Sequence, residues 1–313
     1  MRIGSLLASA TEILYAIGAG DEVVAVSEKC DFPAEARGKP VIVRSRIDGR
    51  LPQRVIDEQV NQAVRRGESL YEVDAAALAR LGCDLLVTQD VCHVCAASPQ
   101  DLGCILGALA PPPALLALNP HRLADVWDDI RRLGAATARE AQAEALAAAL
   151  DARTRAPGCA PAHRPRVLCL EWFDPPFIGG HWVPEMVALA GGEDVLGVPG
   201  GPGFSAAWDR ILETRPEAIV LMPCGYHLEG VVEQYAQFRP PPGWDDLPAV
   251  RAGRVFAVDA SGHFSRHGPR LAEGVESLRQ IVAACAAPPP HPSRAVARRR
   301  GAAWTRLGAA LPA

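Results

Sequence analysis

The sequence predicts an α/β protein with two Rossmann-like lobes that one long rigid α-helix joins, and three observations lead to this fold class. Short apolar runs alternate with helical patterns, which is typical of strand–helix units in a parallel sheet. The chain has 313 residues, about twice a typical domain, so two lobes are expected. Residues 123–155 are rich in Ala, Glu and Arg, with no Pro and a single Gly, and therefore favour one helix.

The first lobe, residues 1–120, carries short apolar runs bounded by turn residues. Two of its helices have clear starts: Asp74 is an N-cap, and Ser98 is an N-cap followed by Pro99 at the first helical position. The predicted elements are strand 3–7, helix 11–17, strand 23–27, strand 41–43, helix 51–66, helix 74–81, strand 84–88, helix 98–109 and strand 114–117.

Residues 121–156 form the predicted connecting helix, and a helix of about 30 residues would be about 45 Å long. Residues 157–285 form the second lobe, which repeats the strand–helix alternation. Its predicted elements are strand 167–170, helix 184–190, strand 194–196, helix 206–213, strand 218–222, helix 228–238, strand 255–258 and helix 269–285. Residues 286–313 are rich in Pro and Arg, and we predict that they are disordered.

Composition excludes several kinds of partner. The net charge is −4, which gives no electrostatic reason to expect nucleic acid or an anionic membrane as partner. No run of about 18 apolar residues is present, so no membrane insertion is expected. An odd number of cysteines, nine, favours a reducing compartment. Thr11 and Glu12 interrupt the apolar N-terminus, so it does not resemble a secretory signal. The sequence therefore predicts a cytoplasmic protein, with a periplasmic location as the alternative.

Five cysteines follow predicted strands, where the ligands of open α/β sheets gather. Two of them, Cys92 and Cys95, stand in a Cys-x-x-Cys spacing that suits a metal or a redox disulfide, with His93 as an alternative nitrogen ligand. The predicted soft-metal site, for zinc or an iron–sulfur cluster, consists of Cys30, Cys92, Cys95, Cys169 and Cys224. The alternative is that cysteine here is a small buried apolar residue.

Residues 169–186 hold further candidate ligand contacts. Glu171 at a strand end can accept hydrogen bonds from ligand amides, or it is a solvated loop residue. His181 is a candidate for an axial metal ligand or a surface histidine, and Trp172 and Trp182 are candidates for ligand contact or for lobe packing. No Ser–His–Asp signature or G-x-S-x-G turn is present, so no catalytic residue is predicted.

The segments SLLASATEILYAIGAG, VAVSEKCDFPAEA, DLLVTQD and EWFDPPFIGGHWVPEMVALAGGEDVLG, in this order, resemble the cobalamin-binding members of the helical-backbone periplasmic binding proteins. These are the class III substrate receptors of vitamin B12 and iron-siderophore ABC importers. The resemblance covers residues 1–284 and implies that a corrinoid or metal chelate lies in a cleft between the lobes. Residues 45–70 are longer than the loop that this resemblance leads us to expect.

The resemblance also implies ligand contacts from Phe32, Gln89, Asp90, Phe177 and a loop that includes His263. The whole predicted set is Ser9, Phe32, Gln89, Asp90, Glu171, Trp172, Phe177, His181, Trp182, Ser261, His263 and Phe264. The first hypothesis is non-catalytic binding of cobalamin or a related corrinoid, for uptake, salvage or delivery, with an ABC permease as partner if the protein is exported. The alternative is a cytosolic protein that binds a metal ion or iron–sulfur cluster through the cysteines.

Overall fold

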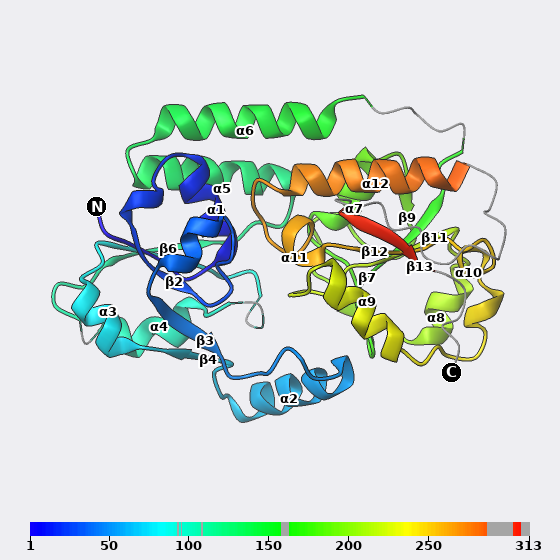
Figure 1. The fold of residues 1–313 in the computed structure, drawn as a ribbon, viewed down its shortest axis with the longest axis horizontal. Coiled ribbons are helices and arrows are strands. Elements are labelled where there is room, and N and C mark those ends of the chain that lie inside the picture. Colours follow the sequence, from blue (N-terminus) through cyan, green and yellow to red (C-terminus); the bar gives the residue numbers. More distant parts are fainter. Residues whose placement is uncertain (93, 95, 108, 158–162, 287–302, 308–313) are drawn as a thin grey trace. The chain divides into compact units, whose positions relative to one another are not determined.

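The computed structural model describes residues 1–92, 94, 96–107, 109–157, 163–286 and 303–307. The chain divides into two compact units (Figure 1). Unit 1 consists of Met1–Leu51, Val55–Asp151 and His267–Pro269, and unit 2 of Pro52–Arg54, Ala152–Arg266 and Arg270–Ala313. Each unit is an α/β lobe around its own sheet, so the predicted fold class is confirmed.

Unit 1 is built on a six-stranded sheet in the order β4-β3-β2-β1-β5-β6. The parallel strands are β1 (Ile3–Ser5), β2 (Val23–Ser27), β3 (Val41–Ser45), β5 (Leu85–Gln89) and β6 (Ala114–Leu118), and β4 (Tyr71–Val73) is antiparallel to β3. The helices are α1 (Ala8–Ala16), η1 (Gly20–Glu22), η2 (Ala34–Gly38), α2 (Gln53–Arg66), α3 (Ala75–Leu81), α4 (Pro99–Leu106) and α5 (Leu123–Ala136). Because neighbouring strands run parallel, their carboxyl ends meet at one edge of the sheet.

The predicted helix over residues 121–156 is interrupted, and this part of the prediction is wrong. The chain forms α5, turns, and continues as α6 (Glu140–Arg155). Ala138 at the turn has a left-handed backbone with φ 53°, and Arg139 N donates to Gly134 O at 2.8 Å. α5 and α6 lie side by side (Figure 1), and Gly134 permits this because a Cβ there would collide with Ala143. The boundary between the units falls inside α6, so this 16-residue helix is the connecting one.

Unit 2 is built on a seven-stranded sheet in the order β10-β8-β7-β11-β12-β13, with β9 paired to β7. The strands are β7 (Arg166–Phe173), β8 (Pro176–Ile178), β9 (Glu193–Asp194), β10 (Phe204–Ser205), β11 (Ala218–Leu221), β12 (Val255–Val258) and β13 (Trp304–Leu307). The helices are α7 (Val183–Leu189), α8 (Trp208–Glu213), α9 (Leu228–Gln237), η3 (Trp244–Asp246), α10 (Pro248–Arg251), α11 (Ala260–His263) and α12 (Leu271–Ala286). β7, β11 and β12 are parallel, so their carboxyl ends also share one edge.

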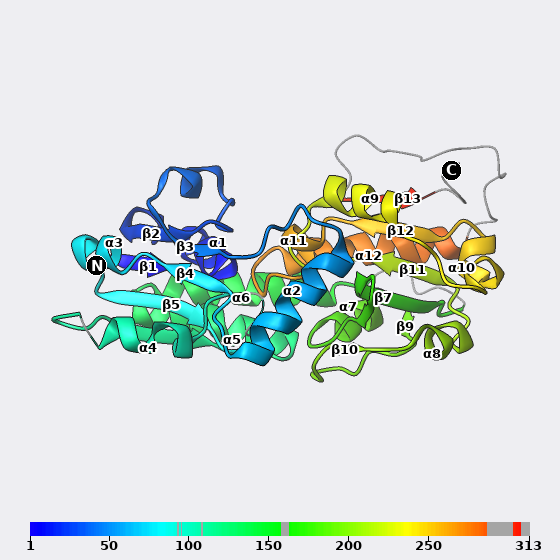
Figure 2. The same cartoon turned by 90° about the horizontal axis from the view of Figure 1, so that it is seen from below.

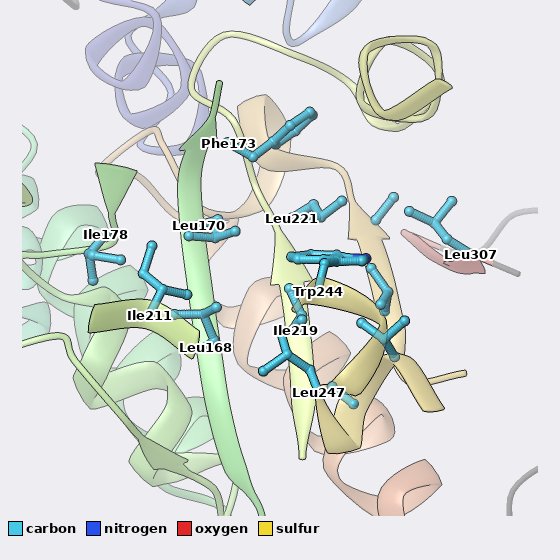
Figure 3. Packing of buried hydrophobic residues seen from close by; sticks show 14 of the residues in the cluster. Leu168, Leu170, Phe173, Ile178, Ile211, Ile219, Leu221, Trp244, Leu247 and Leu307 are labelled. Carbon is cyan, nitrogen blue, oxygen red and sulfur yellow. The ribbon is translucent and has the colours of Figure 1, made fainter. Parts of the chain in front are cut away.

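The core of unit 2 follows from the alternation of side chains along its strands. Leu168, Leu170, Ile219 and Leu221 point to one face of the sheet, where they pack with Trp244 and other residues of the helices that cover it (Figure 3). Residues of opposite parity, such as Cys169, face away from this cluster and are equally buried. Helices therefore cover both faces of the sheet, as strand–helix alternation predicts.

The C-terminal segment contains a strand that the sequence did not indicate. β13 pairs antiparallel with β12, and the ring of Trp304 lies 5.5 Å from that of Phe256 in an edge-to-face contact. α9 lies beside β12 and β13 (Figure 2). The prediction that residues 286–313 are disordered is therefore wrong for Trp304–Leu307, and residues 287–302 and 308–313 lie outside the described residues. In the part of the chain that the structure describes, no helix has both the length and the apolar character needed to cross a membrane.

Candidate ligand-binding site

Three loops meet at the carboxyl edge of the unit 2 sheet, one after each parallel strand. The backbone ties them together: Cys224 N donates to Glu171 O at 3.1 Å, and Ser261 N donates to Tyr226 O at 2.8 Å. The rings of Trp172 and Tyr226 lie 5.8 Å apart in a tilted contact. This edge therefore carries an aromatic pair that is held by a backbone framework.

Phe177 adds an exposed aromatic surface to this region. It lies in β8, where it pairs with Trp172 of β7, and 38% of its surface is exposed. A Cβ added at Gly203 would lie 2.7 Å from Phe177 Cε1 and 3.2 Å from Glu171 Oε2. The absence of a side chain at Gly203 thus lets an aromatic ring and a carboxylate lie close together.

The polar groups of this edge include residues that the sequence interpretation missed. His227 Nδ1 lies 2.9 Å from Asp259 Oδ1, and Gly262 N donates to the same oxygen at 2.9 Å. Burial would raise the pKa of Asp259, but the hydrogen bonds from His227 and Gly262 lower it, so Asp259 is an anion. Burial raises the pKa of Tyr226 to about 12 and keeps its phenol neutral. The local signal was weak: only Gly225, with φ 87°, marked this turn in the sequence.

Several predicted contacts instead belong to the interior of unit 2. Trp182 is 5% exposed and Phe264 1% exposed, and Trp182 Nε1 donates to Phe264 O at 2.8 Å. Ser261 is also buried. Their burial does not favour direct contact with a ligand, and as ligand contacts all three remain predictions.

The two predicted histidines are half-buried. His181 has φ 52°, and its backbone is held by hydrogen bonds with Gly200 and Gly201, while its ring lies 5.6 Å from that of Trp182. His263 ends α11. Both remain predictions as ligand contacts.

In unit 1 the four predicted contacts differ in accessibility. Phe32 follows β2 and is 46% exposed, and Asp90 follows β5 and is exposed. Gln89 is buried, and its Oε1 accepts hydrogen bonds from Val91 N at 2.7 Å and Cys92 N at 2.9 Å, so its amide shapes the turn after β5. Ser9 is also buried, with its Oγ 3.5 Å from His267 Nε2. The burial of Gln89 and Ser9 indicates structural roles for both side chains, and their roles as ligand contacts remain predictions.

The predicted cysteine site is not supported. Among the described residues, no three His, Cys, Asp or Glu side chains lie together in a way that could hold a metal ion. Cys30 is buried within unit 1, where its Sγ lies 3.1 Å from Thr11 Oγ1. Cys169 is fully buried in unit 2, and burial raises the pKa of its thiol well above the usual value, with Asp194 and Glu171 adding to the rise. A thiol that resists ionisation is a poor metal ligand.

The remaining cysteines of that prediction do not restore it. Cys92 in unit 1 and Cys224 in unit 2 are partly exposed. Cys95 and His93 lie outside the described residues. The structure thus offers no set of thiolates for zinc or an iron–sulfur cluster among the residues that it describes.

Comparisons with known proteins agree with this geometry. Residues 109–261 match the family model described as periplasmic binding protein. A vitamin B12-binding protein of Vibrio vulnificus is 23% identical over 284 residues, which cover 88% of this chain and 88% of that protein. An uncharacterized ABC transporter substrate-binding lipoprotein of Bacillus subtilis is 24% identical over 294 residues, covering 90% of this chain and 79% of that protein. The periplasmic heme-binding protein RhuT from Roseiflexus has a TM-score of 0.68 at 23% identity, covering 91% of this chain and 99% of that chain.

The fold, with two α/β units that each surround their own sheet, is that of solved periplasmic solute-binding proteins. This chain is similar to periplasmic binding proteins in sequence and in fold, which agrees with the resemblance indicated by its motifs. The cytoplasmic location predicted from the N-terminus and the cysteine count is contradicted, because the relatives that match along most of the chain are periplasmic proteins or a lipoprotein of an ABC transporter.

Proposed function

We propose that this chain binds cobalamin or a related corrinoid, and that the aromatic side chains at the carboxyl edge of unit 2 contact the macrocycle. The observation that carries the proposal is the exposure of Phe177 beside the Trp172–Tyr226 pair. A corrin ring is broad and largely apolar. Covering the exposed 38% of the Phe177 surface with such a ring removes apolar area from water, which favours binding. Phe32 offers a similar surface in unit 1.

The charge of the edge favours a corrinoid over haem. Glu171 lies next to Phe177, and Asp259 is an anion. The periphery of a corrin carries neutral amides, whose N–H groups donate to carboxylates, whereas haem carries two propionates that carboxylates repel. The similarity to vitamin B12-binding proteins along most of the chain supports the same choice.

Haem is the second candidate. Structural similarity to heme-binding proteins supports it, and so does the partly exposed imidazole of His227, a side chain that commonly ligates haem iron. We also propose that the protein is an extracytoplasmic receptor that delivers its ligand to a membrane permease. The location of the relatives supports this role.

Titration of the purified protein with cyanocobalamin and, separately, with haemin tests the function. We expect saturable binding of one cyanocobalamin per chain by calorimetry, with a shift of the visible corrin bands. Binding of haemin alone, with a sharpened Soret band, would replace the corrinoid by the second candidate. If neither compound bound saturably, the proposed function would be wrong.

A further inference from the structure

Within residues 45–70, three consecutive residues are assigned to unit 2 and the others to unit 1. Pro52–Arg54 belong to unit 2, although Leu51 before them and Val55 after them belong to unit 1. We call these three residues the strap. The strap includes Gln53 and Arg54, the first two residues of α2, and the rest of that helix belongs to unit 1.

The strap holds the carboxyl end of β7 through consecutive residues. Gln53 Oε1 accepts hydrogen bonds from Phe173 N at 3.0 Å and from Asp174 N at 3.2 Å. Gln53 O accepts one from Trp172 Nε1 at 3.3 Å. Arg54 Nη2 lies 2.6 Å from Asp174 Oδ1. Each of the residues 172–174 is therefore tied to the strap.

These ties fall at the base of the candidate site. β7 and β8 form a hairpin in which Trp172 pairs with Phe177 and Phe173 pairs with Pro176. The indole that Gln53 O holds is the one that contacts Tyr226. The orientation of both aromatic surfaces thus depends on the end of β7 that the strap fixes.

Gln53 has a feature that packing alone does not explain. It is 3% exposed, and its Nε2 is buried without a hydrogen-bond partner among the described residues. An unpaired buried donor is unfavourable, and in native proteins it often marks a position kept for a function. The oxygen of the same amide serves two backbone N–H groups, which an apolar side chain of this size cannot do.

We infer that Gln53 is a positioning residue of the ligand site, which presets the Trp172–Phe177 surface through the end of β7. This inference rests on the proposed function, because the affinity that Gln53 tunes is that for the corrinoid. Arg54 contributes less, since its side chain is 66% exposed and its pair with Asp174 is screened by water.

Replacement of Gln53 by Met tests the inference, because Met has a similar volume and no strong acceptor. We expect the affinity for cyanocobalamin to fall about 10-fold, which corresponds to about 1.4 kcal/mol, and the amides of Phe173 and Asp174 to exchange hydrogen faster. Gln53→Glu keeps an acceptor at the same distance and should restore most of the affinity. Gln62→Met is the matched control, because Gln62 is an exposed glutamine of the same helix.

A second control separates positioning from general stability. Ile211→Val removes one methylene from the core of unit 2 and should lower the melting temperature without changing affinity. If Gln53→Met lowers the melting temperature as Ile211→Val does but keeps the wild-type affinity, the inference is overturned. Failure of the wild-type protein to bind a corrinoid would instead overturn the proposed function. In that case the amide exchange rates of Phe173 and Asp174, compared between wild type and Gln53→Met without ligand, would still report whether the strap holds β7.

Discussion

Phe177→Ala removes the aromatic surface that the proposed function depends on most. The side chain is 38% exposed in the free protein. A phenylalanine has about 200 Å² to bury in full, so about 75 Å² remains for a ligand to cover. At about 25 cal/mol per Å² this area contributes about 2 kcal/mol, and its loss should weaken binding about 20- to 30-fold.

The affinity of Phe177→Ala for cyanocobalamin is measured by isothermal calorimetry beside that of Leu115→Ala. Leu115 is an apt control because it is also 38% exposed. It lies near the amino end of β6 in unit 1, away from the carboxyl end of that strand. Leu115→Ala should therefore keep the wild-type affinity, and a thermal melt of each variant verifies that it is folded.

Two results would refute this reasoning. An affinity of Phe177→Ala within twofold of the wild-type value would show that the ligand does not cover this ring. An equal loss in Leu115→Ala would show that the effect comes from a general loss of exposed apolar surface rather than from the carboxyl edge of unit 2.

Three further predictions concern charge and thiols. Burial raises the pKa of Asp129 to about 6, so folding favours its protonated form, and this stabilisation, about 3 kcal/mol, is lost as the pH rises from about 4 to about 6. The free energy of unfolding in urea should therefore rise for Asp129→Asn relative to wild type, by up to about 3 kcal/mol, between about pH 4 and about pH 6. If the unfolding free energies of the two proteins changed with pH in parallel, the prediction would be wrong. Arg153 forms two hydrogen bonds with Glu276, so Arg153→Ala should lower the free energy of unfolding by about 1 kcal/mol. Because salt screens ion pairs, 1 M salt should reduce the difference in unfolding free energy between wild type and variant. A difference that salt does not change would count against the ion pair. Cys169 should stay unlabelled by a thiol reagent in the native protein while Cys224 reacts, and peptide mapping that found both equally labelled would disprove the burial of Cys169.

Much of the fold could be predicted because the information is local. The runs that became β2, β5, β11 and β12 are apolar segments bounded by turn residues, and the predicted bounds agree with the structure within one or two residues. The break between α5 and α6 could not be predicted in the same way. Ala138 adopts a left-handed backbone although alanine favours helix, because the close packing of Gly134 against Ala143 turns the chain back.

The candidate site was predictable only in part. The rule that ligands gather at carboxyl ends of parallel strands pointed to Glu171 and Trp172, which lie near the carboxyl end of β7, while Phe177 in β8 was implied by the resemblance. Their roles as ligand contacts stay predictions. The same rule could not reveal Gln53. The hydrogen bonds of Gln53 with Phe173 and Asp174 join residues 120 and 121 positions apart, and no local sequence pattern indicates such contacts.

Burial, rather than residue type, decides which side chains of the unit 2 sheet can contact a ligand. Cys169 lies within β7, paired with Val220 of β11, and is wholly enclosed, whereas Phe177 in β8 is 38% exposed. Enclosure raises the pKa of the Cys169 thiol and so removes the thiolate that zinc would need. Exposure leaves the Phe177 ring in water, where covering it with an apolar macrocycle is favourable. The enclosure of Cys169 thus argues against a metal bound by this cysteine, and the exposure of Phe177 is what the proposed corrinoid contact requires.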